Sequence, residues 1–280
     1  MKIIKICMNM ERIKKMHAIT TLTDYLNCIK EISYNDPIDN KNIYRCFRGQ
    51  ANKNWELIPS LFRDNNLDEY KLLKESRRIL WKELNIFNSL EQLTLLQHYG
   101  LPTRLLDVTM NPLVALYFAC LPPKEEKVDV DGAVYIIDLK EENNDMKEAN
   151  NDWLLKLCNA LFTNNDLKIF LNESLKSDSN KKHTICIRDH FILPPLSDER
   201  IERQSGAFIF SEVFREVYNM NIYLRNTFDV RKHYKYKIVV PRLNKTKILQ
   251  ELRECGIHEG FLFPDVEHKI KYITQTVLHK

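Results

Sequence analysis

Residues 97–119 read QHYGLPTRLLDVTMNPLVALYFA, and they join a polar segment to a long apolar one. Polar and ionisable side chains crowd residues 97–109, a turn between two strongly apolar segments that we expect to be helical. Burying such side chains without partners is costly, so they must pair with one another or line an open cleft. Two interpretations follow: Arg104 pairs with Asp107 as a structural brace, or the segment forms part of a functional site.

Helix and strand patterns follow one another along the chain without regular alternation. Asn111 and Pro112 open the apolar run at residues 113–121, and Pro in the first turn favours a buried helix. The remaining patterns predict helices at residues 23–32, 68–90, 90–99, 152–172 and 245–254, and strands at residues 43–48, 133–139, 184–187, 207–210 and 236–240. They predict an α+β fold: a single mixed domain at residues 19–280 with a small central sheet flanked by helices, preceded by a poorly structured extension at residues 1–18.

The composition narrows the class of protein without giving a function. Hydrophobic residues make up 44% of the 280 residues and charged residues 29%, as in an ordinary folded domain. No apolar run reaches the roughly 18 residues that a membrane helix needs. The 7 cysteines have no Cys-x-x-Cys spacing, which favours free thiols in a reducing compartment over disulfides or a zinc site. We therefore expect a cytoplasmic protein with no bound metal and no membrane partner.

The charge balance permits contact with nucleic acid but does not imply it. Lys and Arg number 42 against 38 Asp and Glu, a net charge of only +4. Proteins that bind a duplex usually carry a larger and more clustered basic excess. The basic residues that could contribute here are Lys14, Lys15, Arg231, Lys232, Lys235 and Lys237.

A second informative stretch, FRGQ at residues 47–50, ends a predicted strand. The guanidinium of Arg48 could fork onto a phosphate or carboxylate, and Gly49 would let the backbone approach a ligand closely. An arginine at the end of a strand is also commonly just solvated. The stretch is therefore compatible with a binding site without requiring one.

A third stretch, residues 198–208, leads from a charged turn into an apolar strand. Gln204 offers both a hydrogen-bond donor and an acceptor there, and Gly206 permits close approach. No His-Glu-x-x-His, Gly-x-Ser-x-Gly or phosphate-loop motif is found in the sequence. Zincins, serine hydrolases, kinases and Rossmann dehydrogenases are therefore unsupported.

Together these stretches resemble the FRG domain family, whose naming motif stands here as Phe47-Arg48-Gly49. The resemblance covers roughly residues 20–275. It includes WELIPSLFR at residues 55–63, the block at residues 97–119, the RQSGAF segment at residues 203–208, and residues 248–256 and 262–265. One position departs from the family pattern: Val108 stands where Trp is common. The family is frequent in bacterial and phage-related genes.

The order of these motifs is also similar to that of ADP-ribosyltransferases, which implies a related fold and NAD as the substrate. In that case Arg48 would fork onto the NAD pyrophosphate, Thr109 would hold the first strand or the ribose, and Tyr99 would stack on the nicotinamide. The resemblance implies catalytic roles for Arg48, His98, Thr109 and Gln204, and binding roles for Gln50, Tyr99, Thr103, Arg104 and Asp107.

The third motif leaves the activity open. Such transferases generally carry Glu where this chain has Gln204, although Glu202 or Glu212 could take its place. One hypothesis is an NAD-dependent ADP-ribosyltransferase-like effector that acts as a toxin or in antiphage defence on a protein or nucleic-acid acceptor. The alternative is a non-catalytic module that binds a nucleotide or nucleic acid. A purely structural interaction protein would leave the clustered polar residues without a shared purpose.

Overall fold

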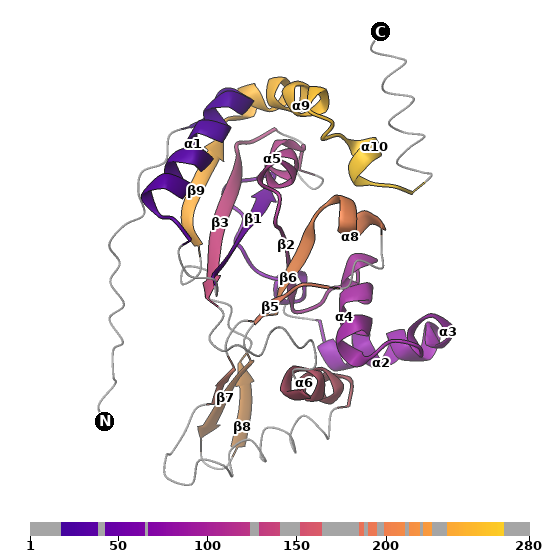
Figure 1. Ribbon diagram of the computed structural model, residues 1–280. Helices are drawn as coiled ribbons and strands as arrows, with labels where there is room; N and C mark the ends of the chain where they lie inside the picture. Colours follow the sequence, from indigo (N-terminus) through magenta and orange to yellow (C-terminus); the bar gives the residue numbers. More distant parts are fainter. Residues whose placement is uncertain are drawn as a thin grey trace, which may run out of the picture. The chain divides into compact units, whose positions relative to one another are not determined.

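A computed structural model describes residues 18–38, 43–64, 67–123, 129–140, 152–163, 185–187, 190–194, 199–210, 213–218, 221–225 and 234–265 (Figure 1). The chain forms two compact units, each assembled from separate segments. The first unit lies within residues 1–55, 110–139 and 231–280, and the second within residues 56–109 and 140–230. Helices and strands are mixed in both, which confirms the predicted α+β class. The extension predicted at residues 1–18 falls almost wholly outside the described residues.

In the first unit, helices pack on one face of neighbouring strands. Its elements are α1 (Leu22–Asn35), β1 (Ile43–Gln50), α5 (Pro112–Cys120), β3 (Gly132–Lys140), β9 (Tyr234–Val240), the short 3-10 helix η4 (Arg242–Asn244), α9 (Lys245–Glu254) and α10 (Glu259–Leu262). The strands lie in the order β1-β3-β9, and β3 and β9 are antiparallel. Phe47, Val134 and Ile238 share one buried cluster with residues of all four α-helices. Because side chains alternate along a strand, their neighbours point to the opposite face.

Two glycines let α5 lie directly against the strands. A Cβ atom at Gly49 would lie 1.8 Å from the carbonyl oxygen of Ala115, and one at Gly132 would lie 2.0 Å from that of Ala119. The sequence suggested that Gly49 makes room for a ligand, but the helix backbone takes that room. α5 begins as predicted: Asn111 accepts a hydrogen bond from the N–H of Leu113, and Pro112 occupies the first turn.

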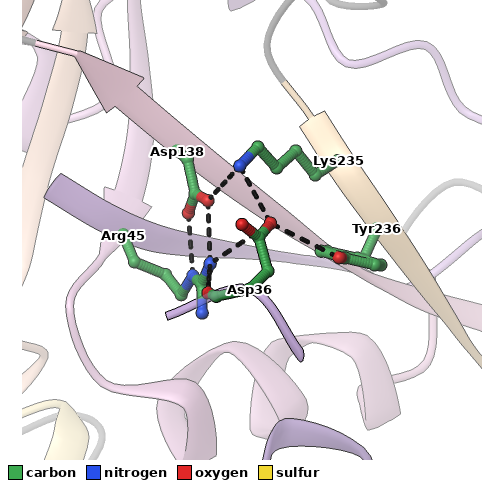
Figure 2. A network of polar contacts seen from close by, with 5 residues as sticks. All are labelled: Asp36, Arg45, Asp138, Lys235 and Tyr236. Carbon is green, nitrogen blue, oxygen red and sulfur yellow. Dashed lines mark hydrogen bonds and ion pairs between the residues drawn. The ribbon is translucent and has the colours of Figure 1, made fainter. Parts of the chain in front are cut away.

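A network of charged side chains ties the three strands to the end of α1 (Figure 2). Arg45 on β1 makes two 2.8 Å hydrogen bonds to the carboxylate of Asp138 on β3. Lys235 on β9 lies 2.8 Å from Asp36, the residue that ends α1, and 3.2 Å from Asp138. Tyr236 donates a weaker hydrogen bond of 3.4 Å to Asp36. Every charge in this network has an opposite partner, so we interpret it as a structural brace.

The second unit contains two groups of paired strands and a separate core. Its elements are η1 (Ser60–Phe62), α2 (Glu69–Ile79), α3 (Trp81–Leu84), α4 (Ser89–His98), β2 (Leu105–Thr109), α6 (Asp152–Phe162), β4 (Ile185–Ile187), β5 (His190–Ile192), α8 (Glu199–Arg203), β6 (Gly206–Phe210), β7 (Val213–Tyr218) and β8 (Asn221–Arg225). β5, β6 and β2 lie side by side in that order, and β4, β7 and β8 form another sheet. Leu93, Leu105 and Phe210 are completely buried in a cluster shared by α2, α3, α4, α6 and strands β2, β5 and β6.

Several predicted elements need correction. The helix expected at residues 68–90 is broken at Leu80, whose φ of −103° and ψ of 33° are not helical, into α2 and α3. The turn expected at residues 97–109 ends in strand β2, which was missed because its apolar residues are buried on both faces and show no alternation. The turn expected near residue 199 contains helix α8. Strands β5, β7 and β8 and helix α10 had no clear signal.

Replacing Gly49 with Ala should destabilise the protein, because α5 would have to move away from β1. We expect the free energy of unfolding, measured by urea denaturation, to fall by about 3 kcal/mol. Gly206→Ala is the matched control, since its added Cβ would meet its nearest neighbour at an ordinary 3.4 Å. That variant should change stability by less than about 1 kcal/mol. Equal losses in the two variants would contradict this account of Gly49.

The brace in Figure 2 should make stability depend on acidic pH. The hydrogen bond from Lys235, together with the charges of Lys235 and Arg45, lowers the pKa of Asp36. A lowered folded-state pKa stabilises the fold above the unfolded value of about 3.9, and the gain is lost as the pH falls through the folded-state pKa. Asp36→Asn should therefore cost about 1 kcal/mol at pH 7 and progressively less below about pH 4.

The measurement is a series of urea denaturation curves between pH 7 and pH 3 for wild type and Asp36→Asn. Glu31→Gln provides a control, because it removes a carboxylate from the exposed side of the same helix. We expect its curves to follow those of wild type at every pH. A constant gap between Asp36→Asn and wild type down to pH 3 would show that the Asp36 charge contributes nothing.

Candidate functional site

The predicted site residues fall into two groups, one in each compact unit. Arg48 and Gln50 lie on β1 in the first unit. The other predicted residues belong to the second unit: His98, Tyr99, Thr103, Arg104, Asp107, Thr109 and Gln204. That Arg48, His98, Thr109 and Gln204 line one cleft stays a prediction.

In the second unit, Thr109 lies next to the backbone of Gln204. β2 and β6 are antiparallel, and Thr109 stands opposite Gly206. The hydroxyl of Thr109 donates a 2.6 Å hydrogen bond to the backbone carbonyl of Gln204. The contact therefore fixes the turn before β6, where Ser205 has a left-handed φ of 45° that is unusual for a residue with a side chain. Thr109 positions this turn through its only hydroxyl proton.

Asp107 and Thr103 are joined through a residue outside the predicted set. The amide of Gln97 donates to Asp107 at 2.9 Å, and its oxygen accepts from the Thr103 hydroxyl at 2.6 Å. The N–H of Leu105 in turn donates to that hydroxyl at 3.1 Å. Thr103 is completely buried, whereas Asp107 is exposed. Thr103 is thus a buried structural residue. Asp107, at the other end of this series of hydrogen bonds, is the residue that solvent or a ligand can reach.

Arg104 pairs with Glu69 on α2, so the brace expected between Arg104 and Asp107 is wrong. The Nε of Arg104 lies 2.7 Å from one oxygen of Glu69, and its Nη2 contacts the other. Residues three apart in an extended chain point to opposite faces, which separates Arg104 from Asp107. Arg104 is only 2% exposed and lies near the rings of Phe62 and Phe210. Arg104 therefore supports the core of this unit. It is too buried to contact a ligand, contrary to the binding role predicted for it.

His98 and Tyr99 end helix α4 and differ in exposure. His98 is half-buried, while Tyr99 is 75% exposed. Their rings pack edge to face with centroids 5.2 Å apart. An exposed aromatic ring held by a neighbour offers a flat apolar surface for stacking. This placement is compatible with the predicted role of Tyr99 against a nicotinamide.

In the first unit, Arg48 lies on the face of the strands away from the helical core. Its neighbour Phe47 belongs to that core, so alternation places Arg48 on the other face. Tyr135 on β3 lies between core residues and shares the face of Arg48 by the same argument. Burial raises the pKa of the Tyr135 phenol, and the charge of Arg48 partly offsets this rise. Gln50, two residues further along β1, is buried on this face as well.

Lys237 and Lys53 also lie near Tyr135, on the same side of the strands as Arg48. The sequence had not assigned these two lysines to the site. Lys237 on β9 stands directly opposite Tyr135 in the strand register. Its ammonium lies 5.1 Å from the centre of the Tyr135 ring and donates a 2.7 Å hydrogen bond to the carbonyl oxygen of Lys53. Lys237 had been noted only as part of a basic excess. Its pairing with Tyr135 depends on a register between strands about a hundred residues apart, which the sequence does not reveal.

A metal cluster is not found in the described part of the chain, and two of its buried thiols are unreactive. No group of three or more His, Cys, Asp and Glu side chains is placed there to hold a metal ion. Burial raises the pKa of Cys120 and of Cys158 to about 12, so these thiols stay protonated and unreactive near neutral pH. A helix suited to spanning a bilayer is likewise not found among the described residues.

The scaffold is therefore a mixed α+β protein with an Arg-Gly strand, a polar turn and a buried helix packed on that strand. Residues 44–128 match the model of the FRG domain, which confirms the resemblance: the chain contains an FRG domain. The match includes every predicted site residue except Gln204. No curated protein and no solved structure gives a significant match.

The ion pair between Arg104 and Glu69 should be essential to the second unit, because removing one partner leaves a buried charge. Arg104→Ala should lower the free energy of unfolding by about 3 kcal/mol in urea denaturation. Arg78→Ala removes an exposed partner of Glu75 and should cost less than about 1 kcal/mol.

Replacing both buried partners, as Arg104→Met with Glu69→Met, should recover part of the lost stability, since neither charge is then left unpaired. A double variant less stable than Arg104→Ala would contradict this account, because it would show that the cost does not come from an unpaired charge on Glu69.

Proposed function

We propose that the protein is an NAD-dependent ADP-ribosyltransferase-like enzyme of the bacterial cytoplasm. The observation that carries the proposal is the setting of Arg48, the arginine of the FRG motif. It lies beside buried Tyr135 on the face of β1 opposite the helical core, in the company of Lys237. A guanidinium in a partly desolvated, electropositive setting suits the pyrophosphate of a dinucleotide, which it can bind with two parallel hydrogen bonds.

The proposed reaction transfers ADP-ribose from NAD to a nucleophile on an acceptor. The bond between ribose C1′ and the nicotinamide nitrogen breaks, and its electron pair leaves with nicotinamide. The acceptor nucleophile forms the new bond to C1′ and releases its proton to solvent. In this scheme Arg48 holds the pyrophosphate, and the stacking of Tyr99 on the nicotinamide stays the prediction that the resemblance implies. Thr109 acts by fixing the turn that carries Gln204.

The proposed reaction also needs an acidic side chain to stabilise positive charge at the ribose. Gln204 has no charge to stabilise the cationic character that develops at the ribose. Glu202 lies two residues earlier, exposed on α8, and is the nearest described acidic side chain in the sequence. Glu212 lies outside the described residues. We assign the stabilising charge to Glu202 in this proposal. By resemblance to the family, the enzyme would serve as a toxin or in antiphage defence.

The uncharged Gln204 favours a second candidate function, a module that binds NAD or another nucleotide without turnover. The same Arg48 would then hold the phosphates, and no acidic group would be needed. The two candidates share a ligand class and differ in nicotinamide release. Binding of nucleic acid would differ from both in falling steeply with salt concentration.

Incubation of the pure protein with NAD labelled in its adenosine part, and with protein, RNA and DNA acceptors, tests the proposal. We expect nicotinamide release and transfer of label by wild type, and a loss of about 100-fold in Arg48→Ala, because two charge-assisted hydrogen bonds are removed. Arg78→Ala removes an equal charge from an exposed position of α2 and should leave the rate unchanged.

Binding of NAD without release of nicotinamide in wild type would establish the second candidate. Failure to bind NAD at all would overturn the enzymatic proposal, and failure to bind any nucleotide would overturn the second candidate. An Arg48→Ala variant as active as wild type would overturn the role of Arg48, whatever the activity.

A further inference from the structure

Basic residues from three segments of the first unit act on or contact Tyr135. Lys237 lies over that ring, and its ammonium hydrogen-bonds to the carbonyl of Lys53. The phenol of Tyr135 approaches the same carbonyl at 3.4 Å. The charge of Arg48 acts on Tyr135 from the β1 side. The three basic side chains thus come from β1, from the segment after it, and from β9.

The charges of the two lysines are not balanced by carboxylates among the described residues. The ammonium of Lys53 pairs with Asp131 at 2.9 Å, and Asp131 also accepts a hydrogen bond from the N–H of Arg242. Among the described residues, no carboxylate lies within ion-pair distance of the Lys237 ammonium. Burial lowers the pKa of Lys237, and the charge of Lys53 lowers it further against an opposing effect of Tyr234. Of these two ammonium groups, only that of Lys53 therefore has a carboxylate partner among the described residues.

The hydrogen-bonding capacity of Lys237 is also only partly used. An ammonium has three N–H donors, and the carbonyl of Lys53 takes one of them. The remaining two have no acceptor among the described side chains and backbone carbonyls. A partly desolvated ammonium without a counter-charge is costly, so such an arrangement favours the arrival of an anion with several oxygen acceptors.

We propose that Lys237 and Lys53, together with Arg48, form an anion subsite that binds the phosphoanhydride group of a nucleotide. Arg48 and Lys237 extend from strands separated only by β3, so their backbones are about 10 Å apart. Long basic side chains on these two strands can contact two adjacent phosphates of one ligand. Lys237 lies outside the residues that match the FRG domain. The subsite rests on the proposed function only for the role of Arg48.

The test uses inorganic pyrophosphate and ADP as probes, with adenosine as the ligand that lacks phosphate. We expect calorimetric titration of the full chain to show binding of pyrophosphate and ADP. Lys237→Gln should weaken both by about tenfold or more, because a charge-assisted hydrogen bond is lost. Any binding of adenosine should be equal in wild type and variant. Lys247→Gln is the matched control: it removes the same charge from an exposed position on α9 and should leave affinities unchanged.

Thermal unfolding separates this role from a structural one. Without ligand, Lys237→Gln should melt at the temperature of wild type or above it, because the substitution removes an uncompensated charge. Added pyrophosphate should raise the melting temperature of wild type and have a smaller effect on Lys237→Gln. A variant that melts well below wild type without ligand would instead identify Lys237 as a structural residue and overturn the proposal.

The outcomes also separate this subsite from the proposed function. If wild type binds pyrophosphate through Lys237 but releases no nicotinamide from NAD, the subsite stands and the enzymatic proposal fails. If Lys237→Gln binds pyrophosphate and ADP as tightly as wild type, the subsite is overturned even when NAD is consumed. Equal weakening in Lys237→Gln and Lys247→Gln would also overturn it, because it would reduce the effect to general charge.

Discussion

The contact between the α5 backbone and strands β1 and β3 is the constraint on which the first unit depends. It requires that Gly49 and Gly132 have no side chain, since a Cβ at either position would overlap a carbonyl of the helix. The contact decides which face of β1 joins the helical core. Alternation along the strand then sends Arg48 to the other face, beside Tyr135. The place of the candidate ligand-binding arginine is thus a consequence of how its glycine neighbour packs.

Other buried basic groups of the same unit show what a structural role looks like. Lys245, at the start of α9, is only 2% exposed, and its ammonium meets the carbonyls of Ala51 and Leu121 and lies 3.5 Å from Asp129. Arg45 meets a carboxylate with both of its bonding nitrogens, as Figure 2 shows. Each of these groups has acceptors that satisfy it and a carboxylate nearby. Lys237 has one carbonyl and no carboxylate among the described residues, which is the pattern of a group that awaits a ligand.

The sequence predicted those features that depend on near neighbours. Asn111 and Pro112 marked the start of α5, and Gly100 and Gly256, both with positive φ, marked the ends of α4 and α9. Features that depend on distant residues were missed or wrong. The partner of Arg104 is Glu69, 35 residues away, whereas the nearby Asp107 had looked sufficient. The FRG domain was recognisable because its motifs are contiguous, but the surroundings of Arg48 include β9, far along the chain.

The motif at residues 97–109 therefore combines two kinds of residue. Thr103 and Arg104 are buried and satisfied by Gln97 and Glu69, so their contribution is the stability of the turn and of the core beneath it. Tyr99 and Asp107 are exposed at the two ends of the same turn, where a ligand can reach them. Thr103 and Arg104 thus belong to the family motif because they stabilise the fold. Chemistry in the second unit must come from its exposed members, and substitutions of the buried ones will report on folding before they report on activity.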